Sequence, residues 1–137
     1  MLLFRRAAPA SFAWLLLLLA LIGGCATSSS QPTRSEFEDI PVANGLTYLP
    51  SKSTVIESPT VKAARLVYRG RIEVDSLATA MRSALEANGW RYVSSSANAD
   101  HGITQVYEKA GNPLEVRMTD SWWYTYLEMT ISRTRQQ

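Results

Sequence analysis

The sequence predicts an α+β fold in which a single antiparallel sheet of about five to six strands carries one helix packed on one face. Short segments of alternating apolar and polar residues recur along the chain, as is typical of half-buried strands. One segment instead repeats an apolar residue every four positions, which indicates a helix. Short turns separate the later strands and favour antiparallel pairing. The expected order is strand–strand–helix–strand–strand–strand–strand.

Residues 1–24 have the layout of a secretory signal peptide. Arg5 and Arg6 precede an apolar run from Phe12 to Ile22, and small residues follow it. This run is too short to cross a bilayer core, which takes about 20 apolar residues. Residues 1–24 are therefore predicted to be a targeting segment.

The segment Ile22-Gly23-Gly24-Cys25 resembles the lipobox of bacterial lipoproteins. The resemblance implies cleavage before Cys25, a diacylglycerol thioether on its sulfur, and palmitate or another acyl chain on the new amino group. Ala26 stands where an aspartate would retain a lipoprotein in the inner membrane. The implied location is therefore the outer membrane, facing the periplasm. The alternatives are an ordinary cleaved signal with a chance cysteine, or an uncleaved N-terminal anchor.

Composition changes when the signal is set aside. The full chain has 14 Lys+Arg and 12 Asp+Glu, and both signal-segment arginines would leave with residues 1–24. The remaining domain would be close to neutral, so its composition does not argue for a nucleic-acid partner, which would require a basic patch. Lipidation would consume the one thiol, so no intramolecular disulfide is expected. Residues 25–35 are small and polar and predict a flexible tether.

The predicted domain covers residues 36–133 and begins with an extended N-terminal arm. Pro41 and Pro50 break the arm into short pieces, while Phe37 and Ile40 are too apolar for a free linker. We therefore expect the arm to lie against the domain, where it could cover a sheet edge.

Two strands are predicted before the helix, at 54–57 and 64–74. Apolar residues share one face of 64–74, and Gly70 interrupts that face, which indicates a bulge or a close approach by the helix. The other face carries Arg65, Arg69 and Arg71.

The helix is predicted from Ser76 to about Asn88, with Asp75 as its N-terminal cap. Gly89 stands where a left-handed residue commonly ends a helix, and Trp90 follows it in position to pack on Leu85. The predicted structural residues are therefore Asp75, Leu85, Gly89 and Trp90.

Four strands are expected after the helix, at 90–95, 103–109, 114–119 and about 123–133. In the last strand, Leu127, Met129 and Ile131 should face the core. The polar tail 134–137 is expected to be frayed.

The mature part resembles a family of small uncharacterised proteobacterial lipoproteins. The resemblance rests on the motifs Phe37-Glu38-Asp39-Ile40-Pro41-Val42, Gly45-Leu46, Val67-Tyr68-Arg69-Gly70 and Gly89-Trp90. It spans most of the mature chain and implies no activity.

The aromatic cluster at 122–126 is the most unusual local feature. In a strand whose side chains alternate between two faces, these aromatic side chains cannot all be buried. Some of them should therefore lie on the sheet face opposite the helix, beside the arginines. The candidate interaction surface is Trp122, Tyr124, Tyr126, Arg65, Arg69 and Arg71. Aromatics with arginines are enriched at binding hot spots, and they also suit a sugar or a membrane interface. The alternative is a solvated face whose arginines pair with Glu108, Glu115 and Glu128 across strands.

His101 is the only histidine and lies in the segment Asp100-His101-Gly102. It could be a general base oriented by Asp100, but adjacent side chains in a turn rarely converge, and no second partner is evident. We therefore favour a polar turn residue and expect no enzyme activity. With one histidine, a lipidated Cys25 and no EF-hand spacing, no metal site and no cofactor apart from the covalent lipid are expected.

These observations predict a lipid-anchored, non-catalytic protein of the bacterial cell envelope. We expect it to bind or brace an envelope protein or peptidoglycan through the sheet face opposite the helix. The alternative is a lipoprotein that holds a small apolar ligand in a pocket between the helix and the sheet.

Overall fold

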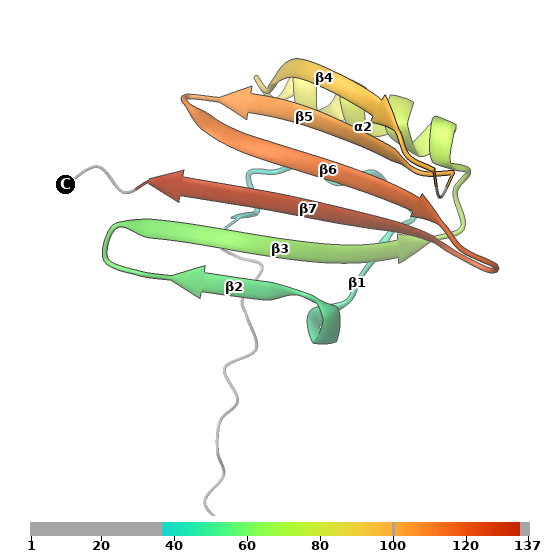
Figure 1. Ribbon diagram of the computed structural model, residues 1–137, viewed down its shortest axis with the longest axis horizontal. Coiled ribbons are helices and arrows are strands. Elements are labelled where there is room, and N and C mark those ends of the chain that lie inside the picture. Colours follow the sequence, from blue (N-terminus) through green and yellow to red (C-terminus); the bar gives the residue numbers. More distant parts are fainter. Residues whose placement is uncertain (1–36, 100, 135–137) are drawn as a thin grey trace, which may run out of the picture.

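The computed structural model describes residues 37–99 and 101–134, which form one seven-stranded antiparallel sheet and a single α-helix (Figure 1). The predicted α+β class is confirmed. The elements are β1 (Thr47–Tyr48), the 3-10 turn η2 (Pro50–Lys52), β2 (Thr54–Glu57), β3 (Val61–Gly70), α2 (Val74–Ala87), β4 (Arg91–Ala97), β5 (Ile103–Lys109), β6 (Asn112–Asp120) and β7 (Thr125–Thr134). The predicted signal peptide, Cys25, the tether, Asp100 and residues 135–137 lie outside the described residues.

The sheet has the order β1-β3-β7-β6-β5-β4, and β2 also pairs with β3. β1 and β2 occupy two stretches of the same edge of β3, with Thr47 opposite Arg69 and Thr54 opposite Arg65. Three strands therefore precede the helix, and the prediction of two was wrong. The missed strand, β1, has two residues, which are too few for alternation to reveal. β7 extends to Thr134, one residue past the predicted end of the domain.

The gap between β1 and β2 is closed by one side chain. Ser53 Oγ accepts the Val67 N–H at 2.9 Å and donates to the Leu49 carbonyl at 2.9 Å. The Leu49 N–H in turn donates to the Val67 carbonyl at 2.8 Å. These bonds satisfy the edge of β3 while the chain turns outward through η2. The turn holds Lys52 at the edge of the sheet.

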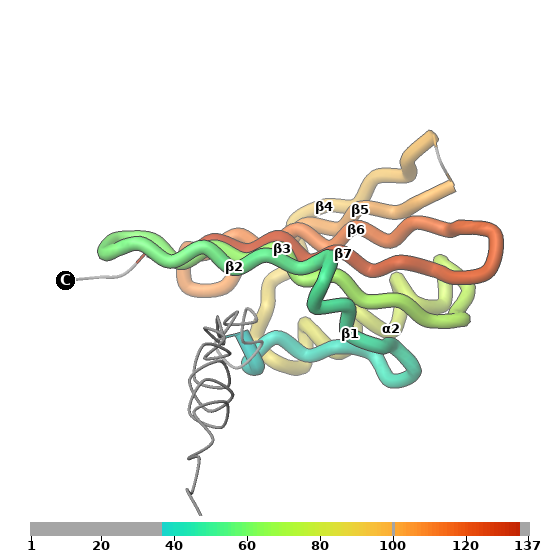
Figure 2. The backbone as a smooth tube through the Cα atoms, turned by 90° about the horizontal axis from the view of Figure 1, so that it is seen from below, coloured from blue at the N-terminus to red at the C-terminus, as the bar shows by residue number. Residues whose placement is uncertain are grey.

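One face of the sheet, the inner face, is mainly apolar and largely buried. Its central strands contribute Leu66, Leu114, Val116, Met118, Leu127, Met129 and Ile131. The predicted core-facing set of the last strand is thereby confirmed. Helix α2 contacts β4, β5 and β6, and the arm at 37–46 lies on the same side of the sheet as α2 (Figure 2). Phe37 and Ile40 of the arm belong to the same core as the helix.

Gly70 is needed because the arm, not the helix, approaches it. A Cβ atom on Gly70 would lie 2.8 Å from the Gly45 carbonyl oxygen and 2.7 Å from Leu46 Cδ2. Because β3 ends there, the predicted continuation to residue 74 was wrong, and Val74 belongs to α2.

The N-terminal cap of α2 is Glu73, so the prediction of Asp75 was wrong by two residues. The Glu73 carboxylate accepts the N–H groups of Asp75 and Ser76 at 2.9 and 2.8 Å. These backbone hydrogen bonds lower the pKa of Glu73. Asp75 lies in the first turn, where its negative charge interacts favourably with the positive end of the helix dipole.

The C-terminal end of α2 is as predicted. Gly89 has φ +81°, and its N–H donates to the Glu86 carbonyl at 3.0 Å. The Trp90 N–H donates to the Leu85 carbonyl at 3.0 Å, which completes a Schellman motif. Trp90 is 3% exposed.

A buried polar link also joins the helix to the sheet. Gln105 on β5 donates to the Ala78 carbonyl of α2 at 3.3 Å and accepts the Tyr107 hydroxyl at 2.8 Å. Burial raises the pKa of Tyr107 to about 12, so this hydroxyl keeps its proton.

Candidate interaction surface

The face of the sheet opposite α2 is the outer face. Both the helix and the arm lie on the inner side, so the described elements leave most of the outer face open (Figure 2). Arg65 and Arg69 of β3 and Tyr126 of β7 stand on this face, where Arg69 pairs in register with Tyr126. The other three predicted site residues, Arg71, Tyr124 and Trp122, lie where β3 ends and β7 begins.

Cations and aromatic rings meet at that end of the outer face. The Arg69 and Arg71 guanidinium carbons lie 4.9 and 5.3 Å from the centre of the Tyr124 ring. Lys52 Nζ lies 4.7 Å from the centre of the Tyr126 ring. We call these five residues the cationic cluster. Such contacts are worth about 0.5–1 kcal/mol at exposed sites.

Trp122 and Trp123, which we call the Trp tip, occupy the turn between β6 and β7. The turn is closed because the Ser121 N–H donates to the Tyr124 carbonyl and to Asp120 Oδ1, each at 3.0 Å. Trp122 is 87% exposed and Trp123 71%. The last strand was predicted to begin at Trp123, but it begins at Thr125, so both indoles lie in the turn rather than alternating across a strand.

Arg65 does not join the aromatic groups. Its Nε and one terminal nitrogen donate to the two carboxylate oxygens of Glu128, each at 2.5 Å. This hydrogen-bonded ion pair raises the pKa of Arg65. Arg91 and Glu108 form a second cross-strand pair between β4 and β5. The alternative of cross-strand ion pairs is thus confirmed for Arg65 with Glu128, while Glu108 pairs with Arg91 instead of an arginine of the predicted surface.

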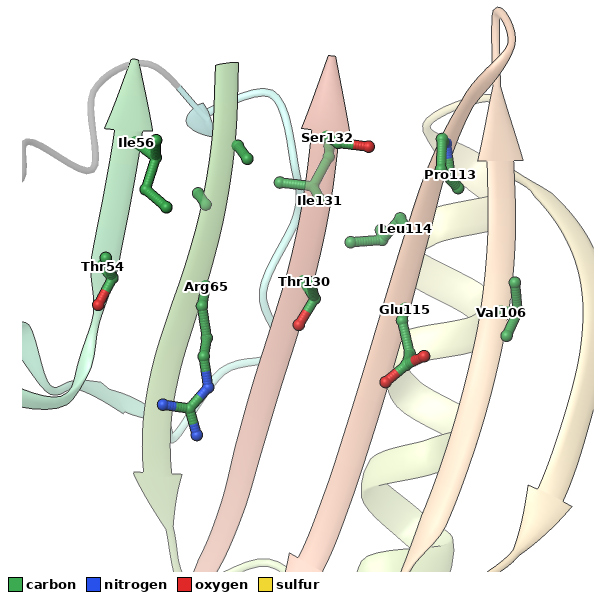
Figure 3. A pocket seen from close by; sticks show the side chains of 12 residues that line it. Thr54, Ile56, Arg65, Val106, Pro113, Leu114, Glu115, Thr130, Ile131 and Ser132 are labelled. Carbon is green, nitrogen blue, oxygen red and sulfur yellow. The ribbon is translucent and has the colours of Figure 1, made fainter. Parts of the chain in front are cut away.

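Two hollows adjoin the Arg65–Glu128 pair. One, the apolar hollow, has a volume of about 560 Å³ (Figure 3). Its outer-face lining is mostly small or apolar and includes Ile56, Ala63, Val106, Pro113, Thr130 and Ser132. The other, of about 600 Å³, is polar and lies toward the cationic cluster, with Lys52, Arg117 and Tyr126 in its lining. The outer face therefore changes from apolar to cationic along the strands.

The apolar ligand pocket was predicted between the helix and the sheet, and that space is filled. Leu77, Met81 and Leu85 of α2 are fully buried in the core. The apolar hollow lies on the opposite face of the sheet, so the predicted position of the pocket was wrong.

His101 lines a third hollow, of about 570 Å³, at the N-terminal end of α2. Glu73, Asp75 and Asp120 line it too, so the fold brings the histidine near carboxylates distant in sequence. Two of these carboxylates already bind backbone N–H groups, Glu73 at the helix cap and Asp120 in the Trp tip turn. Most of the carboxylates that line this hollow therefore already take part in local hydrogen bonds.

Sequence reasoning missed Trp123, Lys52 and Ile56 as surface residues. Trp123 was assigned to a strand, although two adjacent tryptophans cannot share one face of a strand, which was a usable signal. Lys52 reaches the outer face only because η2 turns outward. Ile56 is 62% exposed and lies in a predicted strand. Its local sequence pattern gives no indication that it lines a hollow.

Within residues 37–99 and 101–134, no three metal-ligating side chains group together and no helix could span a bilayer. No family model, no curated protein and no solved structure matches the chain.

Proposed function

We propose that the chain is a lipid-anchored, non-catalytic protein of the bacterial cell envelope that binds a partner through the outer face of its sheet. One observation carries the proposal. The inner face is covered by α2 and the arm, whereas the outer face leaves Ile56 62% exposed beside the apolar hollow and carries the cationic cluster at its other end. Aromatic residues and arginine are the types that dominate binding hot spots.

The partner that the apolar hollow fits best is another envelope protein. Ile56, Ala63, Val106 and Pro113 give the hollow an apolar lining suited to apolar side chains. A peptidoglycan strand would bring many hydroxyl and amide groups, whereas the polar side chains of the lining, such as Arg65 and Glu115, lie beside its apolar part. Peptidoglycan binding is therefore an outcome for the experiment to detect.

Photo-crosslinking in intact cells tests the outer face. A photoreactive amino acid replaces Thr130, which is exposed beside the apolar hollow, and in a matched variant it replaces Ser83, which is exposed on α2. We expect a discrete protein adduct from position 130 and none from position 83. Adducts from position 83 alone, an adduct with peptidoglycan, or none from either position would contradict the proposed protein partner.

The anchor has its own test. Metabolic labelling with palmitate should mark the wild-type protein and the control Ser28→Ala, while Cys25→Ser should carry no label. Mass spectrometry of the mature N-terminus should find an acylated Cys25. An unmodified chain that begins elsewhere would overturn lipid anchoring and leave the outer-face test unaffected.

A second candidate function, binding of a small apolar ligand, is favoured by the apolar lining of the apolar hollow. Its volume of about 560 Å³ falls within the range of about 300–1,000 Å³ usual for ligand pockets. Native mass spectrometry of protein purified from membranes should then show a bound apolar molecule. Ala63→Phe, which fills the hollow, should remove it, while Ala80→Phe on α2 should not.

A further inference from the structure

The Trp tip is unusual because two large apolar side chains are adjacent, exposed and held by a closed turn. The Ser121–Tyr124 hydrogen bond fixes the turn, so the tip is a built projection at the end of the β6–β7 hairpin (Figure 1). Most large apolar side chains of the described residues are buried, and Trp122 is the most exposed of those that are not. Exposed apolar side chains that project in this way are typical of a surface that contacts a membrane or another molecule.

Cations lie directly beside the tip. Pairing of Gly70 with Thr125 places the end of β3 next to the start of β7, so Arg69 and Arg71 reach Tyr124. Four other arginines each pair with a carboxylate: Arg65, Arg82, Arg91 and Arg133. Among the described residues, Arg69 and Arg71 instead contact the Tyr124 ring and have no ion-pair partner. Their positive charge is therefore available to an external anion.

The acidic group nearest in sequence to the tip, Asp120, forms a hydrogen bond within the turn. The register pairs Asp120 with Thr125, whose side chain is buried on the inner side of the sheet. Asp120 lines the hollow at the N-terminal end of α2, and its carboxylate accepts the Ser121 N–H. This end of the hairpin thus combines two exposed indoles with two guanidinium groups that contact the neighbouring Tyr124.

The shape of the tip favours a fluid surface over a sugar or a small ligand. The centres of the two indole rings lie 6.4 Å apart with their planes at 70°, so the rings form no continuous flat platform for an extended sugar chain. Neither indole lines the apolar or the polar hollow of the outer face. Tryptophan is enriched at the membrane–water interface, and arginine binds phosphate groups through several donors.

We infer that the Trp tip inserts both indoles into the interface of an anionic phospholipid bilayer, while Arg69 and Arg71 bind the headgroup phosphates. This contact is separate from the outer-face hollow proposed to bind a protein. It orients the domain on a membrane whether or not Cys25 carries lipid.

Fluorescence of the full-length protein in vesicles tests the inference. In a Trp14→Phe background, the remaining tryptophans are Trp90, Trp122 and Trp123. The protein is reconstituted into vesicles of phosphatidylglycerol and phosphatidylethanolamine, with or without brominated acyl chains. We expect a blue shift and strong quenching by the brominated lipid. Trp122→Ser combined with Trp123→Ser should abolish the quenching, because the buried Trp90 remains as the reporter.

The headgroup contact has a matched control. Arg69→Gln combined with Arg71→Gln should reduce quenching more in the anionic vesicles than in zwitterionic vesicles, whose headgroup phosphates are balanced by a positive charge. Arg91→Gln, at the far edge of the sheet on β4, should behave as wild type. An N-terminal anchor would hold every variant on the vesicle equally, so differences among variants report the tip alone.

Three results would overturn the inference. The first is wild-type emission that brominated lipid does not quench. The second is equal loss of quenching in Arg91→Gln and in the Arg69/Arg71 variant, which would show a non-specific charge effect. The third is a photoreactive group at position 123 that captures a protein in the envelope while brominated lipid leaves the emission unchanged. The outer-face proposal would survive all three, because its test uses position 130.

Discussion

The two faces of the sheet use similar side chains for opposite purposes. On the inner face, Trp90 and Tyr107 are buried among aliphatic residues of α2, the arm and the central strands. On the outer side, Trp122 and Trp123 are exposed. The inner face is closed by two covering elements, whereas no described element covers the Trp tip. The difference shows that stability is concentrated on the inner face, which leaves the outer side free for binding.

Replacing one tryptophan on each side gives the largest expected contrast. Trp90→Ala should lower the free energy of unfolding by about 3–5 kcal/mol, because a buried indole is lost and a cavity remains. Trp123→Ala should change it by no more than about 0.5 kcal/mol, since exposed substitutions rarely matter to stability. Urea denaturation followed by circular dichroism measures both. Equal losses would show that the Trp tip is part of the folded core and would break the contrast.

The contact between the arm and the inner face should give the next largest effect. In Gly70→Ala, the new methyl group would collide with the Gly45 carbonyl oxygen, so the arm must shift. Overpacking of this kind costs about 1–3 kcal/mol. Gly89→Ala is the comparison, because its Cβ would meet only Lys109 Cε at 3.8 Å and its cost of about 1 kcal/mol comes from the positive φ. If Gly70→Ala unfolds at the same urea concentration as wild type, the arm is loosely held.

The inner face was the predictable half of the fold. Alternation in 114–119 and 123–133 identified buried residues such as Val116 and Met129, since one buried face imposes a period of two. The Gly89-Trp90 helix ending could also be predicted, because it depends on residues that are adjacent in the sequence. The cap at Glu73 was missed because glutamate is not among the preferred capping residues. The approach of the arm to Gly70 depends on tertiary packing, which no local pattern contains.

The outer side was predicted only in part. Residue types and alternation placed Arg69 and Tyr126 on one face, and the structure brings Arg69 to Tyr124. The sequence analysis left open which arginine, if any, pairs with Glu128, because cross-strand partners depend on the register between β3 and β7. The apolar hollow was unpredictable for the same reason, since β2, β3, β5, β6 and β7 all line it.

Lowering the pH should have a smaller effect on stability, through the Glu73 cap at the N-terminal end of α2. The backbone hydrogen bonds that lower the pKa of Glu73 stabilise its ionised form in the folded state. That stabilisation is complete above the unfolded pKa, near 4.5, and is lost as the pH falls through the lower folded pKa. Thermal unfolding between pH 7 and pH 2 should therefore show a decline that is shallower in Glu73→Gln. Glu115→Gln on β6 serves as the control, and an equal change in both variants would contradict the capping role.

The Arg65–Glu128 pair should give the smallest effect, although its geometry is bidentate. About half of the Arg65 side chain is exposed, at 52%, so water and salt screen the interaction. A double-mutant cycle with Arg65→Gln and Glu128→Gln should give a coupling of about 0.2–1 kcal/mol that falls as salt is added. Arg82 and Glu86 on α2 provide a comparable exposed pair as the control. A salt-insensitive coupling well above that of the control would mean that the outer face also stabilises the fold, because only a desolvated pair resists screening. A partner that binds beside Arg65 would then compete with an interaction that the domain needs, and the separation between the two faces would fail.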